Sequence, residues 1–181
     1  MAPSIFISQP KRPASNSPPP DATRLYTDGG YKAQNGVGAW AWPAALPSGK
    51  SIAKGRAQFA TTNNRMELMA VIDALEHLEI GPPITIVADS EYVLKGMTQW
   101  THNWAKYGWK NWKGDPIKNK DLWERLVALR DLHQLTYQHV PGHSGHEENE
   151  YVDKICTHLM KDLVQQSKLK ATTVVEWQGF P

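Results

Sequence analysis

The order of strand-like and helical segments is the feature that most constrains the fold of this chain. Three β-type segments come first, and a segment with apolar residues at helical spacing follows. Next comes Ile84-Thr85-Ile86-Val87, a short β-branched run typical of a buried central strand, and then helices, one more strand and a last helix. This order predicts an α/β protein with a mixed sheet flanked by helices. The predicted strands are 24–28, 37–46, 51–60, 84–87 and 135–140, and the predicted helices include 120–132 and 147–163.

Composition separates one predicted domain from two terminal segments. Residues 1–23 are rich in Pro, Ser and Ala and lack an apolar period, so we predict a disordered leader there. We expect a single domain at 24–164 and a C-terminal tail at 165–181, with a short strand at 172–177. No apolar run reaches the roughly 18 residues that a membrane span needs. The single cysteine, Cys156, fits a reducing compartment, so we expect a cytoplasmic protein without membrane contact. Because no sequence feature points to an obligate oligomer, we expect a monomer.

Tryptophan and lysine gather between residues 98 and 120. This segment holds four of the eight tryptophans of the chain, five lysines and a single aspartate. Lysines attract phosphates and indole rings stack on bases, so the segment fits a nucleic-acid surface. It fits equally well a helical hairpin whose tryptophans form a core and whose lysines face water. Because the net charge of the whole chain is only +2, charge does not decide between the two interpretations.

Four acidic residues lie at the ends of predicted strands or near the starts of predicted helices: Asp28, Glu67, Asp89 and Asp153. Each alone has an ordinary interpretation, as a turn residue, a helix-dipole partner, a helix cap or a solvated side chain. If the first and fourth strands are neighbours, the four can meet. Crowded carboxylates become stable around a divalent cation, and oxygen ligands suit Mg²⁺ or Mn²⁺. Spacing alone does not show that they converge.

Several short motifs occur in a characteristic order along residues 24–163. They are Thr27-Asp28-Gly29, Thr62-Asn63-Asn64-Arg65-Met66-Glu67-Leu68, Asp89-Ser90, Gln99-Trp100, Asn103-Trp104, Gly108-Trp109-Lys110, Gly142-His143-Ser144-Gly145-His146, Glu148-Asn149-Glu150 and Asp153. With these motifs the chain resembles the type 1 ribonuclease H family. The resemblance implies a five-stranded sheet of order 3-2-1-4-5 with a helical basic protrusion.

The resemblance also implies an activity and its site. The expected reaction is hydrolysis of the RNA strand of an RNA–DNA hybrid, leaving 5′-phosphate and 3′-hydroxyl ends. Asp28, Glu67, Asp89 and Asp153 would be catalytic ligands of two Mg²⁺ ions, with Mn²⁺ as a substitute. His143 would assist proton transfer or product release, and Glu150 would lie near the second metal.

Contacts with the hybrid are implied for a further set of residues, and they favour the nucleic-acid interpretation of the segment 98–120. These residues are Thr62, Asn63, Asn64, Tyr92, Trp100, Lys106, Trp109, Lys110 and Asn119. Two departures from the family pattern predict weaker binding of the hybrid. Ala60 stands where many relatives have an arginine, and Glu91 stands where a neutral residue is commoner.

Two other functions remain open. Integrases and junction resolvases share the fold and also cut phosphodiesters with acidic clusters, although the Gly-His-Ser-Gly-His loop and the Trp/Lys segment argue against them. The second alternative is a hybrid-binding module without catalysis, and the presence of all four acids argues against it.

Overall fold

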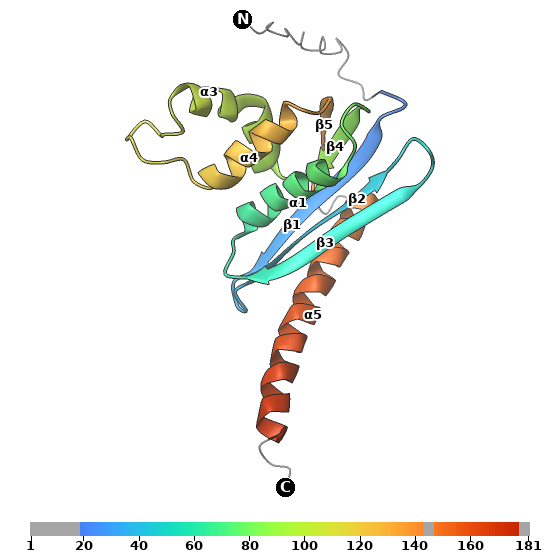
Figure 1. The fold of residues 1–181 in the computed structure, drawn as a ribbon, viewed down its shortest axis with the longest axis vertical. Coiled ribbons are helices and arrows are strands. Elements are labelled where there is room, and N and C mark those ends of the chain that lie inside the picture. Colours follow the sequence, from blue (N-terminus) through green and yellow to red (C-terminus); the bar gives the residue numbers. More distant parts are fainter. Residues whose placement is uncertain (1–18, 143–146, 178–181) are drawn as a thin grey trace, which may run out of the picture.

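A five-stranded mixed sheet forms the centre of the protein (Figure 1). The structure is a computed structural model that describes residues 19–142 and 147–177, with side chains described as far as residue 168. The strands follow the order β3-β2-β1-β4-β5, as predicted, and β1 pairs antiparallel with β2 and parallel with β4. Their bounds are Thr23–Lys32 (β1), Val37–Ala45 (β2), Ser51–Phe59 (β3), Ile84–Ala88 (β4) and Leu135–His139 (β5).

The central strand β1 is longer than predicted. We expected it to end near Asp28, because the following Gly29-Gly30 is typical of a turn. Instead, the pairing with β2 continues through Asp28, opposite Ala41, and through Gly29, opposite Trp40. A glycine stands at position 29 because a helix packs there too closely for any side chain, and the strand continues through it. Asp28 is therefore a strand residue and not a turn residue.

Helices cover both faces of the sheet. Neighbouring residues of a strand point to opposite faces, and Leu25 belongs to the hydrophobic cluster beneath the first helices while Tyr26 packs against the cluster beneath the last one. The helices of the first face are α1 (Asn63–His77), α2 (Glu91–Lys95) and α4 (Lys120–Arg130), with a π-helical turn, η1 (Gly96–Trp100), leading into α3 (Thr101–Lys106). The last helix, α5 (Glu147–Trp177), packs across β1, β2 and β3.

Side-chain N-caps fix the starts of two helices. The Thr62 hydroxyl accepts a hydrogen bond from the Arg65 amide at the start of α1. The Ser90 hydroxyl accepts one from the Val93 amide at the start of α2. Both caps satisfy amides that the first helical turn leaves without partners, so they fix where each helix begins. Each of these helices starts close to one of the acidic residues, Glu67 or Asp89.

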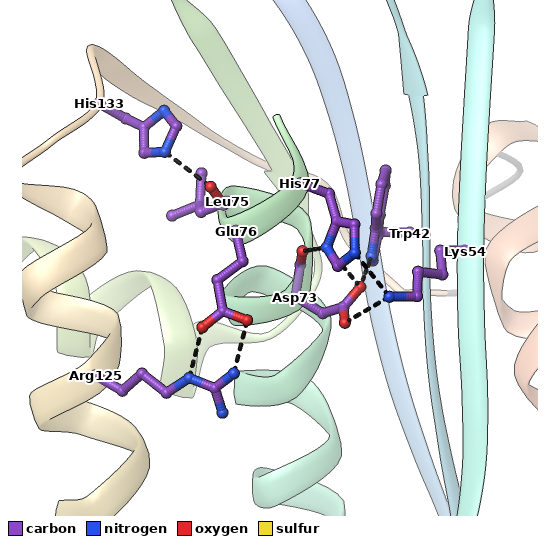
Figure 2. A network of polar contacts seen from close by, with 8 residues as sticks. All are labelled: Trp42, Lys54, Asp73, Leu75, Glu76, His77, Arg125 and His133. Carbon is purple, nitrogen blue, oxygen red and sulfur yellow. Dashed lines mark hydrogen bonds and ion pairs between the residues drawn. The ribbon is translucent and has the colours of Figure 1, made fainter. Parts of the chain in front are cut away.

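A buried aspartate ties α1 to the sheet (Figure 2). Asp73 accepts a hydrogen bond of 2.8 Å from the indole nitrogen of Trp42 on β2 and one of 3.1 Å from the ammonium group of Lys54 on β3. The Asp73 side chain is mostly buried, and its two oxygens have separate donors, as a buried charge requires. The pair of contacts holds α1 over the β2–β3 half of the sheet.

The same helix is joined to the β4–β5 half on its other side (Figure 2). Arg125 of α4 donates two hydrogen bonds of 2.6 Å to the carboxylate of Glu76. His133, just before β5, donates from Nε2 to the Leu75 carbonyl at 2.9 Å. With both sides fixed, α1 has little freedom to slide along the sheet, and this constrains the position of Glu67.

The Trp/Lys segment has a packed part and an exposed part. The Trp104 ring lies 5.7 Å from Trp100, 6.4 Å from Trp109 and 5.5 Å from Trp123 of α4, measured between ring centroids, so this part of the segment forms an aromatic core. Trp112, in contrast, is 90% exposed. The lysines at 106, 110, 113 and 118 are also exposed. The segment is thus a packed base carrying an exposed basic loop.

The predicted strand at 172–177 is wrong. Helix α5 continues through this region to Trp177, well beyond the predicted end at 163, and Figure 1 shows it running past the end of the sheet. The β-branched residues of this region favour a strand, but no glycine or proline interrupts the chain between 147 and 178. Each added helical residue gains a backbone hydrogen bond without needing a partner strand. Among the described residues, no helix is both long enough and apolar enough to span a membrane.

Candidate metal centre

Three of the four predicted acids meet over the centre of the sheet. Asp28 comes from the middle of β1, Glu67 from the second turn of α1, and Asp89 from the residue that follows β4. One carboxylate oxygen of each lies within 4.8 Å of one from each of the others. Asp28 and Glu67 are buried, and Asp89 is half-buried. The parallel pairing of β1 with β4 brings Asp28 and Asp89 together, as the sequence analysis anticipated.

The fourth acid lies on the opposite helix and faces the same cleft. Asp153 of α5 is not part of the group of three within 4.8 Å, but it lines a cleft of about 310 Å³ with all three of them. Glu150 and Asn63 line this cleft as well. Acidic side chains of α5 therefore line one side of the cleft, and Asp28, Glu67 and Asp89 line the other.

The three acids crowd one another electrostatically. Burial raises the pKa of Glu67 well above its ordinary value, and the neighbouring charges of Asp28 and Asp89 raise it further. Hydrogen bonds from the Asn63 side chain and the Gly29 amide partly oppose this pKa rise. A group of buried oxygen ligands that repel one another fits a hard divalent cation such as Mg²⁺, which would remove the repulsion.

Neutralising Glu67 should therefore stabilise the metal-free protein. A carboxyl group whose pKa is higher in the folded than in the unfolded state loses its stabilising contribution as pH rises through the folded pKa. Glu67→Gln removes this loss, so its melting temperature in EDTA should exceed that of the wild type at pH 7, and the difference should shrink at acidic pH. Glu79→Gln, an exposed change beyond the end of α1, is the matched control and should show no such trend. An equal or lower melting temperature for Glu67→Gln at pH 7 would contradict the crowding.

Glycine allows β1 and α1 to approach each other at this site. A Cβ atom on Gly29 would lie 2.2 Å from the Glu67 backbone nitrogen and 2.4 Å from the Met66 carbonyl carbon, both far inside van der Waals contact. The close approach brings Glu67 beside Asp28, although their positions are 39 residues apart in the sequence. A glycine after Asp28 is thus a steric requirement of the acidic group.

The residues predicted to contact nucleic acid fall into two places. Near α1, Thr62 and Asn64 are exposed, while Asn63 reaches back to Glu67. Near α2, η1 and α4, the Tyr92 hydroxyl accepts hydrogen bonds from Asn119 at 3.2 Å and from the Trp123 indole nitrogen at 2.9 Å. The Trp100 ring lies 6.0 Å from the Tyr92 ring. Lys106, Trp109 and Lys110 lie farther along, in the Trp/Lys segment.

Arg65 connects these two places. Its guanidinium donates to Asn119 at 3.4 Å and forms a bidentate pair with Asp121 at 3.0 and 2.7 Å. Asn119 has a left-handed backbone with φ of 59° and does not cap α4 with its side chain, which leaves its amide to these contacts. Ala60 also has a left-handed backbone, with φ of 55°, and Glu91 pairs with Lys95.

One predicted catalytic residue lies outside the described residues, and one contact was not foreseen. His143 belongs to residues 143–146, which the structure does not describe. The side chain of Asn149 donates from Nδ2 to Asp89 Oδ2 at 3.3 Å. Asn149 stands in the motif Glu148-Asn149-Glu150, but a lone asparagine between two acids carries no signal for a contact with a residue 60 positions away.

The sheet order and the acidic centre together define an α/β protein with a ribonuclease H-like fold. The profile of the family described as "RNase H" matches residues 20–161. Ribonuclease H of Methylococcus capsulatus is 43% identical over 147 residues, which cover 81% of this chain and 94% of that protein. Ribonuclease H of Hydrogenovibrio crunogenus is 43% identical over 139 residues, which cover 77% and 95%.

Solved structures agree with this relationship. The crystal structure of LC9-RNase H1, described as a type 1 RNase H with the type 2 active-site motif, superposes with a TM-score of 0.65 at 30% identity, covering 81% of this chain and 75% of that one. A foamy viral protease-reverse transcriptase in complex with dsDNA gives a TM-score of 0.68 at 22% identity, covering 78% and 95%, and supports the fold alone. The chain belongs to the ribonuclease H family, as its motifs indicated, and is a nuclease of the hydrolase class.

Proposed function

We propose that this protein is an endoribonuclease that hydrolyses the RNA strand of RNA–DNA hybrids and leaves 5′-phosphate and 3′-hydroxyl ends. The observation that carries the proposal is the convergence of Asp28, Glu67 and Asp89 within 4.8 Å, in a cleft that Asp153 also lines. The relatives named ribonuclease H, at 43% identity over most of their length, support the same activity.

The four acids would hold two divalent ions, Mg²⁺ or its substitute Mn²⁺. Their oxygen ligands and mutual crowding fit such ions, as the raised pKa of Glu67 indicates. When bound there, the ions would supply activation of a water molecule and charge neutralisation at the leaving 3′ oxygen. Glu150, which lines the same cleft, would adjust the charge near the second ion. His143 would take up or release a proton during the reaction or product release.

The DNA strand would bind across the neighbouring surface. Thr62, Asn64 and Asn119 offer hydrogen-bonding groups for a phosphate, and the Tyr92 and Trp100 rings offer packing surfaces for sugars. The exposed Lys106 and Lys110 would attract the hybrid through its phosphates, and the half-buried Trp109 between them would add a packing surface. Contacts with the 2′-hydroxyls and the shape of the duplex would distinguish the RNA strand. We further infer a cytoplasmic monomer without membrane contact.

A cleavage assay on three duplexes tests this proposal. Purified protein is incubated with end-labelled RNA–DNA, RNA–RNA and DNA–DNA duplexes of one sequence, with Mg²⁺ and with EDTA. We expect cleavage only of the RNA strand of the hybrid, and only with Mg²⁺. The 3′ ends of the fragments should be joined by RNA ligase without prior phosphatase treatment, because they carry hydroxyl groups. Cleavage of DNA–DNA would favour an integrase-like or resolvase-like activity. Binding of the hybrid without cleavage would favour a non-catalytic module.

A further inference from the structure

The acid Asp89 lacks the support that secondary structure gives to its two partners. Asp28 lies within a central strand and Glu67 within a 15-residue helix, whereas Asp89 follows the last residue of β4 and precedes the cap of α2. The main chain on either side of Asp89 is held by β5 and its continuation. His139 Nε2 donates to the Asp89 carbonyl at 3.3 Å, and the Val140 amide donates to the Ala88 carbonyl at 3.1 Å. These contacts fix the backbone but leave the carboxylate free to rotate.

One side chain restrains that carboxylate. Asn149, in the first turn of α5, donates from Nδ2 to Asp89 Oδ2 at 3.3 Å. The chain at Gly142 also passes close to this oxygen, because a Cβ on Gly142 would lie 2.9 Å from Asp89 Oδ2. A side chain at position 142 would therefore press on the same carboxylate oxygen that accepts the hydrogen bond from Asn149.

The unpaired end of the same amide argues against a purely structural role. Asn149 is 94% buried, and its Oδ1 has no hydrogen-bond partner among the described residues. A buried carbonyl oxygen without a donor is unfavourable for folding, and such groups in native proteins are rare. An apolar residue of similar size would avoid the cost of burying this oxygen. The presence of an asparagine is explained if its N–H group acts on Asp89.

The position of Asn149 on α5 links two of the acids. Asn149 lies four residues before Asp153, so both side chains lie on the same face of the helix. Asn149 lines the cleft that contains Asp28, Glu67, Asp89 and Asp153. A bond between Asn149 and Asp89 therefore sets the distance between α5, with its acid, and the group of three acids on the other side of the cleft.

We propose that Asn149 is a positioning residue, which holds the Asp89 carboxylate in the orientation that binds a divalent cation and keeps Asp153 in register with it. This inference rests on the proposed function of the acidic centre. Asn149 itself does not contact the ion or the substrate. Its effect should therefore fall on metal affinity, while the binding of the hybrid by the outer surface should remain as it is.

Two variants test the proposal with Mn²⁺ as the probe. Asn149→Ala removes the amide, and Asn149→Leu removes the donor at nearly constant volume. We expect titration calorimetry without substrate to show Mn²⁺ binding weakened about tenfold or more in both, as for other residues that orient metal ligands. The KM for the hybrid should stay within about twofold of the wild type, and raising Mg²⁺ should restore part of the lost kcat. Glu148→Gln, at the exposed neighbouring position, is the control and should bind Mn²⁺ as the wild type does.

Melting curves in EDTA separate positioning from folding. If Asn149 orients Asp89, Asn149→Leu should melt at or above the temperature of the wild type, because it removes a buried oxygen that has no partner among the described residues and leaves no cavity. Unchanged Mn²⁺ affinity in both variants would overturn the role of Asn149, and so would weaker affinity that always accompanies a lower melting temperature. A wild-type protein that binds no Mn²⁺ and cleaves no hybrid would instead contradict the proposed function.

Discussion

Asp28→Asn should reduce cleavage of an RNA–DNA hybrid by at least about a thousandfold, in line with the loss of essential catalytic groups in other hydrolases. Asp28 is the buried acid at the centre of the sheet, and both Glu67 and Asp89 lie within 4.8 Å of it by their nearest ligand oxygens. The amide has the same shape as the carboxylate but offers a weaker, neutral ligand to a cation. Single-turnover cleavage of a labelled hybrid in saturating Mg²⁺ measures the loss.

Binding of the hybrid should survive the same change. Apart from Asn63, the groups expected to hold the nucleic acid lie outside the cleft that Asp28 lines. Fluorescence anisotropy in EDTA should therefore give a Kd within about threefold of the wild type. Asp131→Asn is the matched control, because this exposed aspartate at the end of α4 pairs only with the adjacent Arg130 among the described contacts. A rate for Asp28→Asn equal to that of Asp131→Asn would refute the catalytic role of the acidic centre.

Gly29→Ala should destabilise the protein by about 3 kcal/mol or more, at the upper end of the range for overpacked cores. The added methyl group would meet the backbone of α1 at Met66 and Glu67, and backbone atoms cannot turn aside as a flexible side chain does. The helix would have to shift from β1, and Glu67 would move away from Asp28. For a domain of this size, the melting temperature should fall by about 6–12 °C.

The neighbouring glycine provides the control for this prediction. A Cβ on Gly30 would approach the end of the flexible Met160 side chain at 3.2 Å, and Cys156 only at 4.0 Å. Gly30→Ala should therefore cost less than about 1 kcal/mol, since Met160 can adjust its rotamer. Equal melting temperatures for the two variants would mean that the contact between β1 and α1 is looser than the structure shows.

The fold was predictable where local pattern and tertiary environment agree. The strand β4 follows from its β-branched run, whose chemistry acts within a few residues, and the structure has this strand where it was predicted. The sheet order was implied by the family resemblance of the motifs rather than by any local pattern. The strand boundaries around Gly29 could not be predicted, because the glycine serves a contact with α1 that is distant in the sequence.

The site shows the same division. The acids Asp28, Glu67 and Asp89 could be singled out as candidates because the predicted elements put them at strand ends and helix starts, where side chains from different elements meet. The contact of Asn149 with Asp89 depends on how α5 docks. Which tryptophans pack together, as Trp104 does with Trp123, and which stay exposed, as Trp112 does, depends on the path of the chain between α3 and α4. Sequence periodicity does not contain either relationship. The extension of α5 to Trp177 was missed because β-branched residues were given more weight than helix continuation.

A crystal of the wild-type protein soaked in Mn²⁺ tests the central claim most directly, since anomalous scattering locates the ions without assumptions about activity. Two anomalous peaks are expected, about 3.5–4 Å apart, with carboxylate oxygens of Asp28, Glu67, Asp89 and Asp153 about 2.0–2.2 Å from them. Asp28→Asn crystals should lose at least one peak. A wild-type crystal with saturating Mn²⁺ and no anomalous density among these four acids would contradict the account.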